Sequence, residues 1–151
     1  MRKYIYIFIF IPLLILSCDY SPIYSDKDNY NFKIEKIELK GDAEINNLID
    51  KKLKKYRTKK SERKISILSK SSYNKISQSK NLSGKTINHL VIIEIMFQIE
   101  NEDKLNTFNF KEEFLIKNFS NKFEESNLEK IKKENSIDLI INQLVSQISI
   151  M

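Results

Sequence analysis

The clearest structural signal in the chain is the stretch HLVIIEIMFQI at positions 89–99. Successive side chains of a strand point to opposite faces of a sheet. One face would carry His89, Val91, Ile93, Ile95, Phe97 and Ile99, and the other Leu90, Ile92, Glu94, Met96 and Gln98. The alternation therefore predicts a long strand with one strongly apolar face, which other segments must cover.

The segments on both sides of this stretch predict three further strands. After a hairpin loop at 101–104, apolar residues alternate at Phe108, Phe110, Phe114 and Ile116. Before it, a strand begins at Ile65 and Ile67, continues less regularly through Tyr73 and Ile76, and ends before a turn at Gly84. A first strand alternates at Tyr30, Phe32 and Ile34 and then, in the other phase, at Ile37 and Leu39. The change of phase predicts a bulge near Glu35 and Lys36.

Two segments have the three-four apolar spacing of helices. The first follows Asp42, a plausible N-cap, and carries Ile45, Leu48, Ile49, Leu53 and Tyr56 on one face. The second is capped by Asn121 or Ser126, and its apolar stripe runs Leu128, Ile131, Ile137, Ile140, Ile141, Leu144, Val145 and Ile148. The order is β-α-β-β-β-α.

This order predicts a single α+β domain at 30–151, with an antiparallel or mixed four-stranded sheet. Three consecutive strands form an antiparallel meander most simply, and both helices then pack on one face of the sheet. The other face would carry Leu90, Ile92 and Met96. These residues are either ordinary scattered surface side chains or contacts to a partner or an acyl chain, and the sequence leaves both readings open.

The N-terminal segment indicates export. Residues 1–17 combine Arg2 and Lys3 with an uncharged apolar run that is shorter than the ~20 residues of a membrane-spanning helix. The run ends at Ser17 and Cys18, which fit a lipoprotein cleavage and lipidation site. Cys18 is the only cysteine, so the chain can form no internal disulfide. We expect a signal peptide at 1–17, a lipid on Cys18, and a polar tether at 18–29.

Composition weighs against an enzyme. Removing 17 of 151 residues leaves 134, and losing Arg2 and Lys3 lowers the formal charge from +6 to +4. His89 is the only histidine, and the two glycines cannot form a phosphate-binding loop. The pairs Glu112-Glu113 and Glu124-Glu125 are expected to be solvated, as is the basic run 51–64, although that run could also contact phosphates. We expect no catalytic site, metal, nucleic acid or cofactor other than the covalent lipid.

The start of the mature chain, CDYSPIY at 18–24, resembles that of the lipopolysaccharide-assembly lipoproteins, the LptE family. Asp19 stands where that pattern has glycine. The Gly84-Lys85-Thr86 step before the clearest strand is similar to one in the family, and so is the passage from Phe119 to Lys130. The order of strands and helices also fits over nearly the whole mature chain.

The resemblance implies a lipoprotein at the periplasmic face of the outer membrane. It would associate with an LptD-like β-barrel and assist lipopolysaccharide transport, with Lys70, Lys75, Lys80 and Lys85 as candidate lipopolysaccharide contacts chosen by location. An auxiliary lipoprotein of a phospholipid transport system is the alternative. Asp19 after the lipidated cysteine is, in some bacteria, a signal for the inner membrane.

Overall fold

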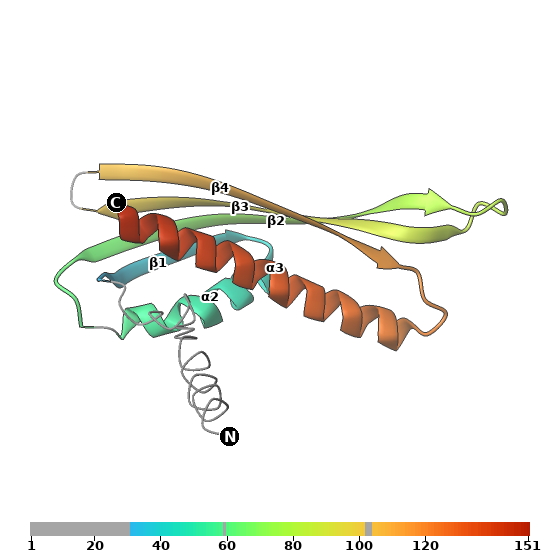
Figure 1. Cartoon of the computed structure of the whole chain (residues 1–151), viewed down its shortest axis with the longest axis horizontal. Helices are drawn as coiled ribbons and strands as arrows, with labels where there is room; N and C mark the ends of the chain where they lie inside the picture. Colours follow the sequence, from blue (N-terminus) through green and yellow to red (C-terminus); the bar gives the residue numbers. More distant parts are fainter. Residues whose placement is uncertain (1–30, 59, 102–103) are drawn as a thin grey trace, which may run out of the picture. The chain divides into compact units, whose positions relative to one another are not determined.

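The computed structural model describes residues 31–58, 60–101 and 104–151, which belong to one compact unit, Asn31–Met151. Its elements are β1 (Lys33–Gly41), α2 (Ala43–Arg57), β2 (Lys64–Lys80), β3 (Thr86–Asn101), β4 (Lys104–Lys117) and α3 (Lys122–Ile150) (Figure 1). The predicted α+β class and element order are confirmed. The expected signal peptide, the tether and the lipidation of Cys18 lie outside the described residues.

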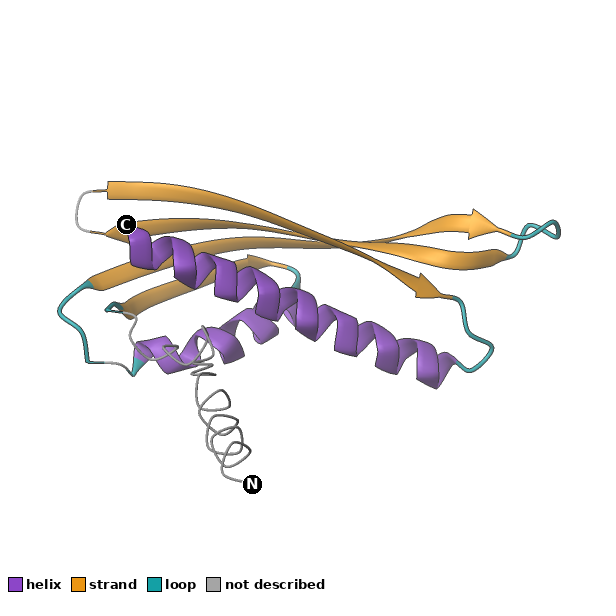
Figure 2. Cartoon of the chain, viewed as in Figure 1, coloured by secondary structure: helices purple, strands orange, loops and turns teal. Residues whose placement is uncertain are grey.

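The sheet has the strand order β1-β2-β3-β4, and both helices cover the same face of it (Figure 2). β1 pairs with β2 in parallel, and β2, β3 and β4 form the predicted antiparallel meander. The bulge predicted in the first strand lies between Ile34 and Lys36. Asp42 caps α2 by accepting a hydrogen bond from Ile45 N at 2.9 Å, and Asn121 rather than Ser126 caps α3.

β2 is longer and more regular than its serine-rich sequence predicts. It continues to Lys80, with its pairing to β3 displaced only around Ser77 and Ser79. Its weak strand propensity is overridden because β3 supplies a continuous ladder of backbone partners. The sheet face under the helices carries the alternating residues of β3 from Val91 to Ile99, all at most 1% exposed, as predicted.

The β2–β3 hairpin projects beyond both neighbouring strands. Pairing of β1 ends where Gly41 meets Ser71, and pairing of β4 ends where Lys117 meets Asn88. The connecting turn is held by Asn81, whose side chain accepts hydrogen bonds from the backbone N–H groups of Ser83 at 3.0 Å and Lys85 at 2.8 Å. The hairpin therefore ends in an ordered, exposed turn, and we call residues 76–87 the hairpin tip.

Candidate functional site

Charged side chains and one tyrosine lie between the first half of α3 and the sheet. We call this group the α3–β2 polar cluster, and it comprises Tyr73, Lys75, Glu125, Glu129 and Lys133. Glu125 is only 6% exposed and Lys133 5%. Buried charges are costly unless they are paired, so these contacts decide how this half of the helix packs.

Lys75 is at the centre of the polar cluster. Its Nζ donates to Glu129 Oε2 at 2.7 Å and to Glu125 Oε1 at 3.3 Å. The Tyr73 hydroxyl also donates to Glu129. The other oxygen of Glu125 accepts from Lys122 Nζ at 2.7 Å and from the backbone N–H of Phe119 at 3.2 Å. Glu125 thus joins β2 to the chain segment that precedes α3.

A second lysine joins this cluster to α2. Lys133 Nζ donates to Glu44 Oε2 at 2.6 Å and lies 4.6 Å from the centroid of the Tyr73 ring. Three carboxylates, Glu44, Glu125 and Glu129, therefore face the three cations Lys75, Lys122 and Lys133. The region is electrically balanced.

These contacts shift the acid–base equilibria of the cluster. The hydrogen bond from Lys122 is the main cause that lowers the pKa of Glu125 to about 2. Burial acts to raise the pKa of Glu129, but hydrogen bonds from Lys75 and Tyr73 outweigh it and the pKa is lowered. Burial and then the bond to Glu129 raise the pKa of Tyr73. Glu125 and Glu129 are therefore ionised, and Tyr73 is neutral, at neutral pH.

We expect acid to weaken the domain through Glu125. A carboxylate whose pKa is lowered by folding contributes stability that is fully present above its unfolded pKa and is lost as the pH falls toward the folded pKa. The wild-type free energy of unfolding, measured in urea, should decline between pH 4.5 and about 2. Glu125→Gln should show a smaller decline over this range. Equal declines in both proteins would contradict the role given to Glu125.

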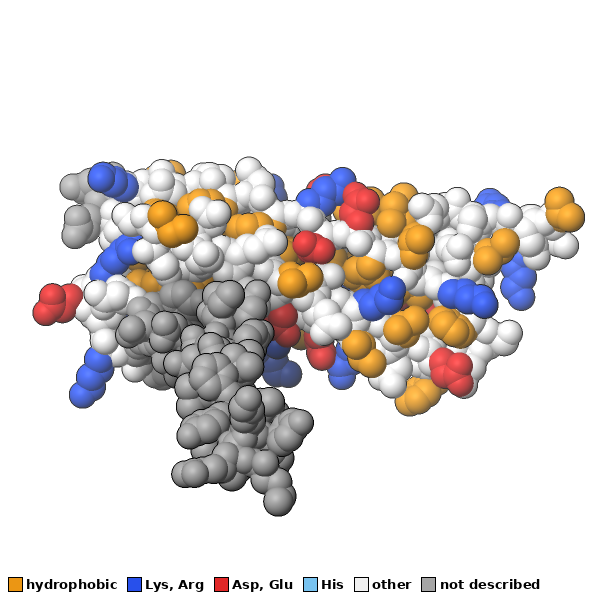
Figure 3. All heavy atoms as spheres, in the orientation of Figure 1, with side chains coloured by type: hydrophobic (Ala, Val, Ile, Leu, Met, Phe, Trp, Pro, Cys, Tyr) orange, Lys and Arg blue, Asp and Glu red, His pale blue; other side chains and the backbone are white. Residues whose placement is uncertain are grey.

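The hairpin tip combines cationic and apolar side chains. From Arg63 to Ile93 the sequence has no Asp or Glu, whereas its basic residues are Arg63, Lys64, Lys70, Lys75, Lys80 and Lys85. Leu82 is fully exposed, Ile76 is 49% exposed and Ile87 39%. Hydrophobic and basic side chains both gather toward this end of the visible face (Figure 3). Such a surface matches an amphiphile with negative charge and apolar chains.

The four lysines predicted to contact lipopolysaccharide lie in three different surroundings. Lys75 belongs to the polar cluster and is already paired with two carboxylates. Lys70 lies on the helix-free face of the sheet. Lys80 and Lys85 are exposed at the end of β2 and in the turn. The structure therefore brings only Lys80 and Lys85 together, and the role of all four stays a prediction.

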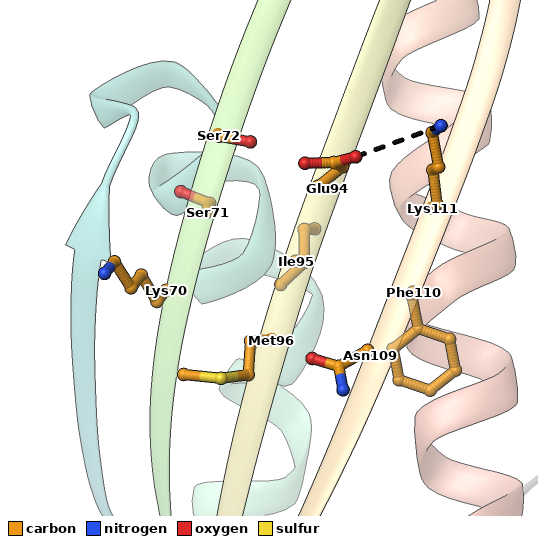
Figure 4. A pocket seen from close by; sticks show the side chains of 9 residues that line it. All are labelled: Lys70, Ser71, Ser72, Glu94, Ile95, Met96, Asn109, Phe110 and Lys111. Carbon is orange, nitrogen blue, oxygen red and sulfur yellow. Dashed lines mark ion pairs between the residues drawn. The ribbon is translucent and has the colours of Figure 1, made fainter.

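The helix-free face has a shallow depression of about 350 Å³ across β2, β3 and β4 (Figure 4). Met96 lies in it, and Lys70, Glu94, Asn109 and Lys111 line its margins. Farther toward the tip, Leu90 pairs with Ile76 and with Leu115 on this face. Ile76 and Leu115 are 49% and 46% exposed. These three side chains form a cross-strand apolar row beside the charged depression.

Two sequence interpretations were wrong for residues of α3. Glu125 was expected to be solvated but is buried, because positions 125, 129 and 133 continue the buried stripe from Ile137 toward the start of the helix. Ile131, predicted in that stripe, is 51% exposed. Positions 125, 129, 133 and 137 are spaced by four, which places them on one face of the helix. The pattern was missed because the first three of these residues are charged. Glu112 of β4, also expected to be solvated, is half-buried.

Metal-binding clusters are absent from the described residues. These residues contain no group of three or more histidine, cysteine, aspartate or glutamate side chains placed to hold a metal ion. His89 is half-buried on the helix-facing side of β3, opposite Ile116 of β4. Within the same part of the chain, no helix is both long and apolar enough to cross a membrane.

Known structures share this fold. The crystal structure of rare lipoprotein B from Shewanella oneidensis matches with a TM-score of 0.55 at 13% identity, covering 74% of this chain and 95% of that one. The solution structure of an uncharacterized lipoprotein B from Nitrosomonas europaea gives 0.55 and 13%, with 80% and 86% coverage. No family model and no curated protein sequence matches. The fold is therefore one that bacterial lipoproteins have.

Proposed function

We propose that this chain is an LptE-like outer-membrane lipoprotein that associates with an LptD-like β-barrel and assists lipopolysaccharide transport. The shared fold supports the lipoprotein part of this proposal, since both matched structures are of bacterial lipoproteins. The CDYSPIY segment at 18–24 also supports it, because it resembles the mature start of LptE-family lipoproteins. The protein acts by binding rather than by catalysis.

The hairpin tip is the observation that carries the ligand assignment. Lipopolysaccharide presents phosphates beside acyl chains, and lysine binds phosphate through charge-assisted hydrogen bonds. Lys80 and Lys85 flank Leu82, so cations and an apolar side chain are available within one turn. The absence of any acidic residue from Arg63 to Ile93 means that nothing within this segment repels an anionic ligand.

The surface of the domain also suits the lumen of a barrel. Lumens of outer-membrane barrels are polar. The helix-free face presents charged and amide side chains, including Glu94, Asn109 and Lys111. Lipid on Cys18 would hold the protein at the periplasmic face of the outer membrane, since more than one acyl chain gives stable anchoring.

Charge reversal at the tip tests the ligand assignment. We expect Lys80→Glu/Lys85→Glu to bind purified lipopolysaccharide at least about tenfold more weakly, since each lysine near an anionic surface contributes roughly 1 kcal/mol. Binding is measured by pull-down with immobilised lipopolysaccharide. Lys54→Glu/Lys130→Glu changes two exposed lysines elsewhere by the same charge and serves as the control. Equal binding by the two double variants would remove the tip as the site.

The apolar row favours a second function, in which the lipoprotein serves a phospholipid transport system. Ile76, Leu90 and Leu115 form an apolar row in which Ile76 and Leu115 are exposed, and this row could contact acyl chains. This function predicts that phospholipid co-purifies with the protein. Native mass spectrometry of the protein purified in a mild detergent, with no bound phospholipid, would count against it.

A further inference from the structure

The two halves of α3 are attached to the domain in different ways. The second half packs through apolar side chains that are at most 4% exposed, which are Ile137, Ile140, Ile141, Leu144, Val145 and Ile148. The first half, Lys122–Lys133, faces the sheet mainly with members of the polar cluster, and Leu128 is its half-buried apolar residue. We call residues 122–133 the strap.

The strap lies over apolar side chains of the sheet. Lys75, Val91 and Phe114 form one cross-strand row on the helix-facing side. The strap reaches both ends of this row, because Glu129 binds Lys75, and Lys132 lies 5.8 Å from the Phe114 ring centroid and donates to Leu115 O at 2.9 Å. Val91, between these ends, is 0% exposed. The strap therefore covers it.

The covered surface extends toward the hairpin tip. The next cross-strand row contains Ser77, His89 and Ile116, and Ile116 is also fully buried. Val91, Phe114 and Ile116 would form the floor of an apolar groove if the strap moved away. That groove would lead toward the hairpin tip, since Ser77 of the tip lies in the same row as Ile116.

We propose that the strap closes a groove for an acyl chain, and that the anionic headgroup of the same lipid opens it by competing for Lys75. This rests on the proposed function for the class of ligand. A phosphate in contact with Lys75 replaces the carboxylates of Glu125 and Glu129 as its partner. The released strap uncovers Val91, Phe114 and Ile116, and the acyl chain lies over them in its place.

The difference between the two halves of α3 explains why only the strap moves. An ion pair can exchange one anion for another without leaving the lysine unpaired, and phosphate is a strong acceptor. The apolar contacts of the second half have no such substitute, so the helix stays fixed from Ile137 onward. A lipid that binds only the open form shifts the population toward it by its own binding free energy.

Hydrogen exchange without ligand tests whether the cluster holds the strap. Glu125→Gln/Glu129→Gln keeps the side-chain size and removes both charges. We expect amides of residues 125–133 to exchange at least about tenfold faster than in the wild type, while amides of 140–148 exchange as before. Glu134→Gln, on the same helix and outside the cluster, should leave both regions unchanged. If the strap amides of the double variant exchange as slowly as those of the wild type, the proposal is overturned.

Exchange with purified lipopolysaccharide tests the ligand. On binding to the wild type, residues 125–133 should exchange faster and 140–148 should not. Binding that leaves exchange in the strap unchanged, or slows it, would overturn the proposal while the proposed function stands. Failure of lipopolysaccharide to bind would contradict the proposed function itself, and the ligand-free comparison still decides whether the cluster holds the strap.

Tyr73→Phe, which removes one hydrogen bond to Glu129, gives a milder variant for the ligand-free experiment if the double variant does not fold.

Discussion

Replacing Gly41 with alanine should lower the free energy of unfolding by about 3–5 kcal/mol, because strain at positive φ and overpacking each cost about 1–3 kcal/mol. Gly41 has φ +101°, and a Cβ there would lie 1.9 Å from Ser71 O and 2.9 Å from Ser71 C. Both atoms belong to the backbone of the central part of β2, so they cannot move away without disrupting the strand. The Asp42 N–H also donates to Ser71 O at 3.3 Å, which holds the chain close as it enters α2.

The second glycine provides the matched control. Gly84 has φ +76°, but a Cβ there would meet nothing within 4 Å. Gly84→Ala should therefore cost only the backbone strain, about 1–2 kcal/mol. Urea unfolding of both variants separates the two effects. Similar losses of stability in the two variants would mean that the contact between the added Cβ and Ser71 has no cost of its own.

Phe97→Ala should lower the free energy of unfolding by about 3–5 kcal/mol, the usual range for an aromatic residue in a core. Phe97 is 0% exposed and packs edge-on to Phe110 of β4, with 6.0 Å between the ring centroids. Truncation would leave a cavity at the centre of β3, between the sheet and the helices.

Phe123→Ala is the control for Phe97→Ala. Phe123 is 76% exposed at the start of α3, so its removal should change stability by less than about 0.5 kcal/mol. Thermal or urea unfolding followed by far-UV circular dichroism gives both values. A small loss for Phe97→Ala would show that the alternation at 89–99 does not define the core.

The fold was predictable where local pattern and tertiary packing agree. The alternation from His89 to Ile99 identified the central strand and its buried face. Asp42 was recognised as an N-cap from its residue type and its position before an apolar stripe. The bulge near Glu35 followed from a change of phase. In each case a few neighbouring residues contain the whole signal.

Other features depend on partners distant in sequence. The length of β2 depends on the ladder that β3 provides, so its own serine-rich sequence could not reveal it. The polar cluster joins β2 to residues of α3 that are 50 or more positions away. Glu125 has the residue type of a surface position, and its burial is possible because Lys75, Lys122 and the backbone N–H of Phe119 bind its carboxylate.

The candidate site was predictable only in part. Sequence position placed Lys80 and Lys85 near a turn, and both are exposed beside it. Residues of one strand that are an odd number of positions apart point to opposite faces. Lys70 and Lys75, five residues apart, therefore lie on opposite sides of the sheet. The exposure of Leu82 could not be predicted, because an apolar residue in a turn is exposed only if no other segment covers it.

Association with an outer-membrane barrel is the central claim, and affinity purification from the native host tests it most directly. A tag at the C-terminus is suitable because Ile150 and Met151 are exposed. After gentle solubilisation of the membranes, we expect a large outer-membrane β-barrel to co-purify in stoichiometric amount. Co-purification of an inner-membrane transporter instead would contradict the claim, and would indicate that Asp19 directs the lipoprotein to the inner membrane.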